Sequence, residues 1–144
     1  MSSKGLKTLI RLSKFNVDEK QRMLVALQGR EDEILGWIRQ QEEQLKEEQR
    51  IAAADAGGVG FAYGAFANAW LSRRETLFSM LELLRADIVR ARDDLAVAFN
   101  ELKTFEITQR ERERREQEER DRKEQAFLDE IGLNLHRRKD KTGG

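Results

Sequence analysis

The sequence has no proline and no cysteine, and His136 is its only histidine. Proline in a helix interior costs about 3 kcal/mol, so a chain without any proline can remain helical over long stretches. The absence of cysteine excludes disulfides and thiolate metal sites, and it permits a reducing compartment. A single histidine in a basic tail excludes a multi-histidine metal site and a histidine-dependent catalytic triad.

Long apolar runs are also missing from the sequence. It has no stretch of about 18 apolar residues, which a membrane-spanning helix would require. Near the N-terminus, Leu6, Ile10 and Leu12 alternate with basic residues instead of forming the continuous apolar core of a secretion signal. We therefore expect a soluble, cytoplasmic protein.

Neither sign of charge is in excess. Lys and Arg together number 27, as do Asp and Glu, so the net charge is zero. Nucleic-acid binding needs an uncompensated basic surface, so no nucleic-acid partner is expected. Hydrophobic residues, at 39%, are too few for a compact single core and suit the narrow buried seam of a two-helix rod.

What the sequence does contain is a regular apolar pattern. Apolar residues recur at alternating steps of four and three, the spacing of a coiled-coil seam, in two long stretches. The first seam has nine apolar residues in fourteen positions: Leu6, Ile10, Ser13, Val17, Lys20, Leu24, Leu27, Glu31, Ile34, Ile38, Gln41, Leu45, Glu48 and Ala52. The second, with Phe66 and Trp70 upstream, has nine in ten: Leu77, Leu81, Leu84, Ile88, Ala91, Leu95, Ala98, Leu102, Phe105 and Gln109.

A glycine cluster within residues 57–64 separates the two stretches and favours a reversal of the chain. If the chain reverses near residues 59–60, the numbers of facing residues add up to about 119. Ile38 then faces Leu81 and Ile34 lies opposite Leu84, so that apolar side chains meet. This match favours an antiparallel arrangement of the two stretches.

We predict an all-α fold, a long antiparallel two-helix coiled-coil hairpin with a protruding C-terminal helical extension. Helix one is expected at about 4–56, the turn at about 57–61 and helix two at about 62–137. The chain is expected to form a single domain over residues 1–144, with 138–144 as a disordered tail.

The extension is expected because helix two is longer than helix one. Fourteen of the fifteen residues in 110–124 are charged, seven of each sign. Acid-first pairs four residues apart, such as Glu111 with Arg115 and Glu119 with Lys123, can support a solvated helix at roughly 0.2 to 0.5 kcal/mol each. Apolar residues then return between Phe127 and Leu135, beyond the reach of helix one. This segment either folds back on itself or, as we favour, docks on another protein.

Nothing in the sequence points to catalysis. The glycines near residue 60 follow a helix instead of a strand, and they lack the Gly-Lys-Ser/Thr sequence of a phosphate-binding loop. Neighbouring carboxylates such as Asp93 and Asp94 diverge by about 100° around a helix axis. We therefore predict no catalytic, cofactor-binding or metal-binding residues, no cofactor, and a protein that is not an enzyme.

Five segments together resemble the FliJ family, the small coiled-coil component of the bacterial flagellar type III export apparatus. They are residues 6–12 (LKTLIRL), 17–22 (VDEKQR), 42–45 (EEQL), 122–131 (RKEQAFLDEI) and 136–139 (HRRK). The resemblance extends over essentially the whole chain. It implies a non-enzymatic hairpin similar to the central stalk of rotary ATPases.

The resemblance also implies partners and contact residues. FliJ-like proteins associate with the hexameric export ATPase FliI, contact the export gate protein FlhA and handle export chaperones. This places the chain at the cytoplasmic face of the inner membrane, at the flagellar base, and peripheral to the membrane through its partners only. The implied contacts with the ATPase ring are Leu6, Leu9, Ile10, Leu12, Leu128, Ile131 and Leu135. Those with the export gate are Trp70, Arg74, Leu77 and Leu81.

Two alternatives remain open at this point. One is a cytoplasmic coiled-coil scaffold or chaperone of another secretion system. The other is a parallel homodimeric coiled coil in which the chain does not fold back.

Overall fold

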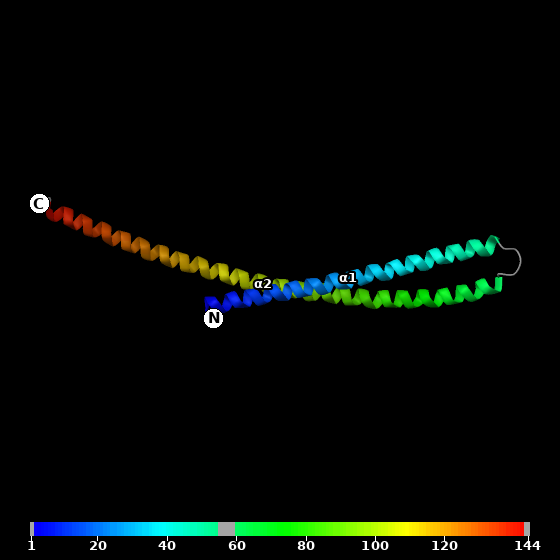
Figure 1. The fold of residues 1–144 in the computed structure, drawn as a ribbon. Coiled ribbons are helices and arrows are strands. Elements are labelled where there is room, and N and C mark those ends of the chain that lie inside the picture. The colour runs from blue at the N-terminus through cyan, green and yellow to red at the C-terminus, as the bar shows by residue number, and fades with distance from the viewer. Residues whose placement is uncertain (1, 55–59, 143–144) are drawn as a thin grey trace. The chain divides into compact units, whose positions relative to one another are not determined.

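The computed structural model describes residues 2–54 and 60–142, and these residues form two helices with no strand. Helix α1 spans Ser3–Ala54 and helix α2 spans Gly60–Thr142 (Figure 1). The two helices pack against each other in opposite directions. The predicted all-α antiparallel hairpin is therefore confirmed, and the alternative of a chain that does not fold back is wrong.

Helix α1 begins with an N-terminal cap at Ser2. The hydroxyl Oγ of Ser2 accepts a hydrogen bond of 3.1 Å from the backbone N–H of Gly5, and the carbonyl of Ser2 accepts one of 3.0 Å from that of Leu6. The first bond satisfies one of the backbone donors that a helix start leaves without partners, and the second is the first hydrogen bond of the helix itself. The cap explains why α1 begins at Ser3, one residue before the expected start.

The expected turn at 57–61 falls largely outside the described residues. Helix α1 is described through Ala54, against an expected end near 56, and α2 begins at Gly60, against an expected start near 62. The sequence between Gly57 and Tyr63 offers no Ser, Thr, Asp or Asn to cap a helix. Without a capping side chain, the sequence carries no local signal that fixes the first residue of α2.

The C-terminal end of α2 differs from the expected one. A disordered tail was expected over 138–144, but the helix continues to Thr142. Lys139 and Lys141 lie in its last turn, where positive charge interacts favourably with the helix dipole. The hydroxyl of Thr142 also donates a 2.9 Å hydrogen bond to the carbonyl of Arg138. These local interactions extend the helix by five residues beyond the expected position 137.

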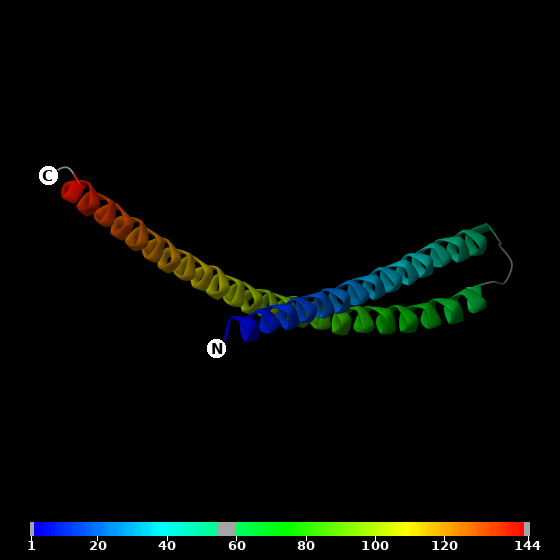
Figure 2. The same cartoon turned by 60° about the vertical axis from the view of Figure 1, so that its left-hand side comes forward.

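The described chain falls into two compact units, where a single domain was expected. The first, which we call the hairpin unit, spans Phe15–Phe99. In it α1 and α2 lie side by side in both views (Figures 1 and 2). Its core is a cluster of five buried side chains, with Leu24, Leu27, Leu35, Leu77 and Met80 packed around it: Ile34, Ile38, Leu81, Leu84 and Ile88. The cluster brings together the residues that the expected register pairs.

Burial follows both predicted seams position by position. Every one of the fourteen positions in the first seam and the ten in the second is buried or half-buried, including the polar ones. Ser13, for example, is 9% exposed. The heptad spacing therefore predicted the inner face of both helices correctly.

Polar contacts also join α1 to α2 in the described part of the hairpin unit. The guanidinium Nε of Arg85 donates a hydrogen bond to Glu31 Oε2 at 3.1 Å. The indole Nε1–H of Trp70 donates to the backbone carbonyl of Gln41 at 2.5 Å. Both contacts cross the seam at polar positions of α1, where the apolar pattern is interrupted.

The second compact unit, which we call the terminal unit, contains the described residues of Met1–Lys14 and Asn100–Gly144. Leu6, Ile10 and Leu102 are buried in it. Shielding of α2 ends at Arg112, and every residue from 113 to 142 is exposed. In this unit α2 therefore continues as a single solvated helix, which matches the expected extension.

Candidate functional site

The functional features of the described chain are surfaces of its helices. Residues 2–54 and 60–142 contain no group of three or more acidic, histidine or cysteine side chains that could hold a metal ion. Neither described helix has a segment long and apolar enough to cross a membrane. Two surfaces gather exposed apolar and charged side chains, one in each compact unit.

The first surface is an exposed apolar face on the single-helix part of α2. Four side chains share it, and we call them the C-terminal face: Phe127, Leu128, Ile131 and Leu135. At 100° per residue they occupy a sector of about 100° around the helix. They are 62%, 52%, 39% and 60% exposed, respectively. The face is therefore amphipathic in pattern but covered by nothing in the described chain.

Leu133 lies on the other side of this helix segment. It is 56% exposed and is surrounded in the helical projection by charged residues such as Asp129 and Asp140. Leu133 thus has the same residue type and exposure as members of the C-terminal face without belonging to it. It provides a matched control for any test of that face.

The N-terminal residues expected to contact an ATPase ring divide into two groups. Leu6 and Ile10 are buried in the terminal unit, Leu9 is half-buried, and Leu12 is 59% exposed. Since shielding of α2 ends at Arg112, Leu128 lies sixteen residues further along the helix, about 24 Å at 1.5 Å per residue. The expected N-terminal and C-terminal contact residues do not form one continuous patch.

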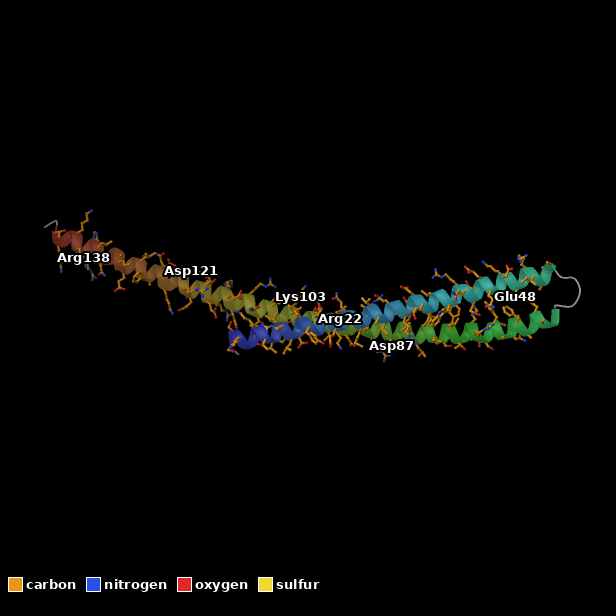
Figure 3. All side chains as sticks on the ribbon, viewed as in Figure 1. Arg22, Glu48, Asp87, Lys103, Asp121 and Arg138 are labelled. Carbon is orange, nitrogen blue, oxygen red and sulfur yellow. The ribbon has the colours of Figure 1, made fainter. Side chains whose placement is uncertain are left out.

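In residues 111–123, between the expected N-terminal and C-terminal contact residues, charged side chains stabilise α2 through ion pairs within the helix. Arg114 hydrogen-bonds to Glu111 and, at 2.6 Å, to Glu118. The expected pairs of Glu111 with Arg115 and Glu119 with Lys123 are present, at 3.7 and 4.0 Å. Figure 3 shows side chains, including those of Asp121 and Arg138, standing out from the C-terminal half of α2.

The hydrogen bonds from Arg114 hold the pKa of the Glu111 carboxyl below its usual value of 4.5. In return, the same bonds raise the pKa of Arg114 above its usual value. In the hairpin unit Arg50 likewise lowers the pKa of the Glu47 carboxyl. Both acids are on the surface, so these are interactions of solvated helix faces and not of a buried catalytic pair.

The second surface, in the hairpin unit, is built around Arg74. The guanidinium carbon of Arg74 lies 5.8 Å from the ring centroid of Trp70 and 4.8 Å from that of Phe78. The three residues are four positions apart, so they lie on one side of α2. Trp70 is itself fixed by its hydrogen bond to the Gln41 carbonyl and is 8% exposed. The structure therefore holds Arg74 against two rings while leaving it exposed.

The four residues expected to contact the export gate differ in accessibility. Leu81 is 3% exposed and belongs to the core, and Trp70 is nearly as buried. Leu77 is half-buried and Arg74 is exposed. Phe78 was not among the expected contacts, although its spacing of four from Arg74 would have indicated it. A partner that binds this side of the hairpin unit can therefore contact Arg74, Phe78 and the exposed Leu71, whereas Trp70 and Leu81 lie below the surface.

A shallow groove of about 410 Å³ lies on the same part of the hairpin unit. Its lining residues come from both helices: Trp37, Gln40, Gln41, Ser72, Arg73, Thr76 and Leu77. Trp37 is 43% exposed, and the side-chain oxygen Oε1 of Gln41 is buried without a hydrogen-bond partner in the described residues. The groove borders the surface around Arg74 but is not lined by Arg74, Trp70 or Phe78.

These features define an all-helical hairpin protein with exposed apolar and charged surfaces on its helices. The sequence matches the family model described as Flagellar FliJ protein over residues 2–141, and the chain belongs to the FliJ family. No curated protein and no solved structure matches it. Membership gives the chain a role related to flagellar protein export, in a family of non-enzymatic export components.

Proposed function

We propose that this chain is the stalk and coupling component of a bacterial flagellar type III export apparatus. It binds the hexameric export ATPase FliI, modulates its hydrolysis of ATP, and links it to the export gate protein FlhA and to export chaperones. The family match favours this role over a scaffold or chaperone of another secretion system. The chain itself hydrolyses nothing.

The observation that carries this proposal is the C-terminal face. Four large apolar side chains on a single helix are exposed to water beyond the reach of α1. Burying them would remove this unfavourable exposure, and each large apolar side chain contributes roughly 1.5 to 3 kcal/mol when fully buried. A binding partner, rather than the chain itself, supplies the cover.

We assign the contact with the ATPase ring to Leu128, Ile131 and Leu135, together with Leu9 and Leu12 at the N-terminus. Leu6 and Ile10, also expected at this contact, are buried in the terminal unit. They hold the first turns of α1 in place and so support the contact from within.

We assign the contact with the export gate to Arg74 and the edge of Leu77. Trp70 and Leu81 act there from below the surface, because they position α2 within the hairpin unit. The proposed location is the cytoplasmic face of the inner membrane, which the chain reaches through its partners. No nucleic-acid partner is proposed, because the net charge of the chain is zero.

The ring contact predicts the behaviour of a triple variant, Leu128→Gln, Ile131→Gln and Leu135→Gln. Glutamine is a good helix former, so the helix is retained while the apolar face is lost. We expect affinity for the purified export ATPase of the same organism to fall at least about tenfold, since central apolar anchors dominate interface energies. The change in ATP hydrolysis caused by the chain should disappear as well.

The matched control is Leu133→Gln, which removes an equally exposed leucine from the other side of the same helix. It should bind and modulate the ATPase as the unaltered chain does. Equal losses in both variants would show that the C-terminal face is not the contact. Absence of any binding by the unaltered chain would contradict the proposed ring contact itself.

A further inference from the structure

Arg74 is an exposed arginine of the hairpin unit whose guanidinium lies against two aromatic rings. Both rings that hold it are fixed to α2 at positions one turn before and one turn after it. Trp70 is further anchored to α1 through the Gln41 carbonyl. An arginine held in this way loses little conformational freedom on binding, so its hydrogen bonds to a partner cost less entropy.

The guanidinium of Arg74 is in no ion pair within the described residues. Further along the hairpin unit, Glu31 on α1 pairs with Arg85 on α2. The same register places Glu42 opposite Arg74, yet the structure shows no ion pair between them and Arg74 lies on the rings instead. The donors of Arg74 are thus left for a group outside the chain.

The surroundings of Arg74 define what such a group must look like. A guanidinium stacked on rings still presents N–H donors at its edge, in the fork geometry that matches a carboxylate. Leu71 and Phe78, 50% and 40% exposed, lie seven residues apart on the same side of α2. They offer an apolar surface directly beside the fork.

We propose that Arg74 recognises a carboxylate on an acidic segment of a partner protein, which also places an apolar side chain over Leu71 and Phe78. The inference rests on the proposed contact with the export gate and gives that contact its chemistry. Trp70 is a positioning residue in this scheme, because it acts by holding Arg74 and not by touching the partner.

The test uses the complete chain and the purified cytoplasmic part of the export gate protein from the same organism. Affinity is measured by isothermal titration calorimetry for Arg74→Gln, Arg74→Lys and Arg73→Gln. Arg73 is the matched control, because it is the neighbouring arginine but lines the groove, whereas the contacts with the rings of Trp70 and Phe78 are made by Arg74. Circular dichroism checks that each variant keeps the helical content of the unaltered chain.

We expect Arg74→Gln to weaken binding about tenfold or more, as for an arginine at the centre of an interface. Arg74→Lys should lose most of that affinity, since lysine keeps the charge without the planar fork. Arg73→Gln should stay within about twofold of the unaltered chain. Raising the salt concentration should weaken the binding of the unaltered chain to the gate protein more than that of Arg74→Gln.

Three results would overturn the inference. Unchanged affinity of Arg74→Gln would remove the carboxylate contact while leaving the gate contact in place. Equal losses of affinity for Arg73→Gln and Arg74→Gln would show that the arginines act only by general charge attraction, without a specific carboxylate contact at Arg74. Failure of the unaltered chain to bind the gate protein would refute the proposed gate contact and this inference with it.

A separate measurement addresses another occupant of this surface, a second copy of this chain. Light scattering should give a monomer for both the unaltered chain and Arg74→Gln. A dimer that Arg74→Gln dissociates would assign the surface to self-association and overturn the proposal.

Discussion

Five polar residues interrupt the seam of α1, and two of them join the helices of the hairpin unit. Glu31 pairs with Arg85, and Gln41 receives the indole of Trp70 on its backbone carbonyl. An exposed ion pair of this kind contributes little free energy, typically below about 1 kcal/mol. Its contribution is to register, because a shift of one helix along the other would separate both pairs of atoms.

Stability at the residue scale comes from the apolar cluster. Ile34 is 1% exposed and lies in the cluster with Leu81 and Leu84. Ile34→Ala should lower the free energy of unfolding by about 2 to 5 kcal/mol, because it removes buried apolar surface and leaves a cavity. Thermal or urea unfolding followed by circular dichroism measures the change.

The control for this substitution is Leu83→Ala, at a side chain that is 71% exposed on the same helix as Leu84. It should change the free energy of unfolding by less than about 0.5 kcal/mol. Similar losses of unfolding free energy in the two variants would contradict the placement of Ile34 on the inner face of the hairpin and of Leu83 on its outer face.

At the scale of the element, the single-helix part of α2 depends on charge pairs instead of a core. Because the folded pKa of Glu111 lies below its usual 4.5, the stabilising interaction with Arg114 is complete above that value. It is lost as the pH falls through the lowered pKa, since protonation removes the charge. Glu47 behaves in the same way with Arg50.

Acidification is therefore expected to loosen the charged segment of α2. Amide hydrogen exchange in residues 110–124 should speed up when the pH is lowered from 6 to 3, after correction for the intrinsic pH dependence of exchange. Amides around Ile34 and Leu84 should change less, because apolar burial does not titrate. Equal acceleration in both segments, or none in 110–124, would contradict the stated role of these pairs.

The sequence predicted most of the element-scale structure. Heptad spacing identified the inner faces, and the residues that the expected register pairs, such as Ile38 and Leu81, lie in one cluster. The register itself is shifted by about three residues, because the numbers of the paired Glu31 and Arg85 add up to 116 instead of 119. The ends of the helices were predicted less well. They depend on single hydrogen bonds, at Ser2 and between Thr142 and Arg138, which the spacing of apolar residues does not report. The partner of each charge was also hard to predict: Glu118 pairs with Arg114 and Arg122 with Glu119, since several acids lie within reach of each arginine.

The candidate surfaces were predicted only in part. The return of apolar residues after Phe127 indicated an exposed face, because helix one is too short to cover it. The placement of Arg74 against the rings of Trp70 and Phe78 could not be predicted from the heptad pattern. That pattern indicates which residues are buried but not where an exposed side chain points. The indole of Trp70 turning to the Gln41 carbonyl is a tertiary contact that no spacing rule specifies.

At the scale of the whole molecule, each compact unit supplies one surface. The terminal unit carries the C-terminal face, and the hairpin unit carries Arg74 on its rings. The proposed coupling role needs two such surfaces on one FliJ-family chain, one for each partner. The variants proposed above should accordingly affect the two partners separately.

The central claim is that the single-helix end of α2 is completed by the export ATPase. Hydrogen–deuterium exchange on the complete chain, with and without that ATPase, tests it most directly. In the free chain, residues 127–139 should exchange rapidly, because no core protects them. We predict that exchange there slows markedly when the ATPase is added, and binding that leaves residues 127–139 as unprotected as before would contradict the account.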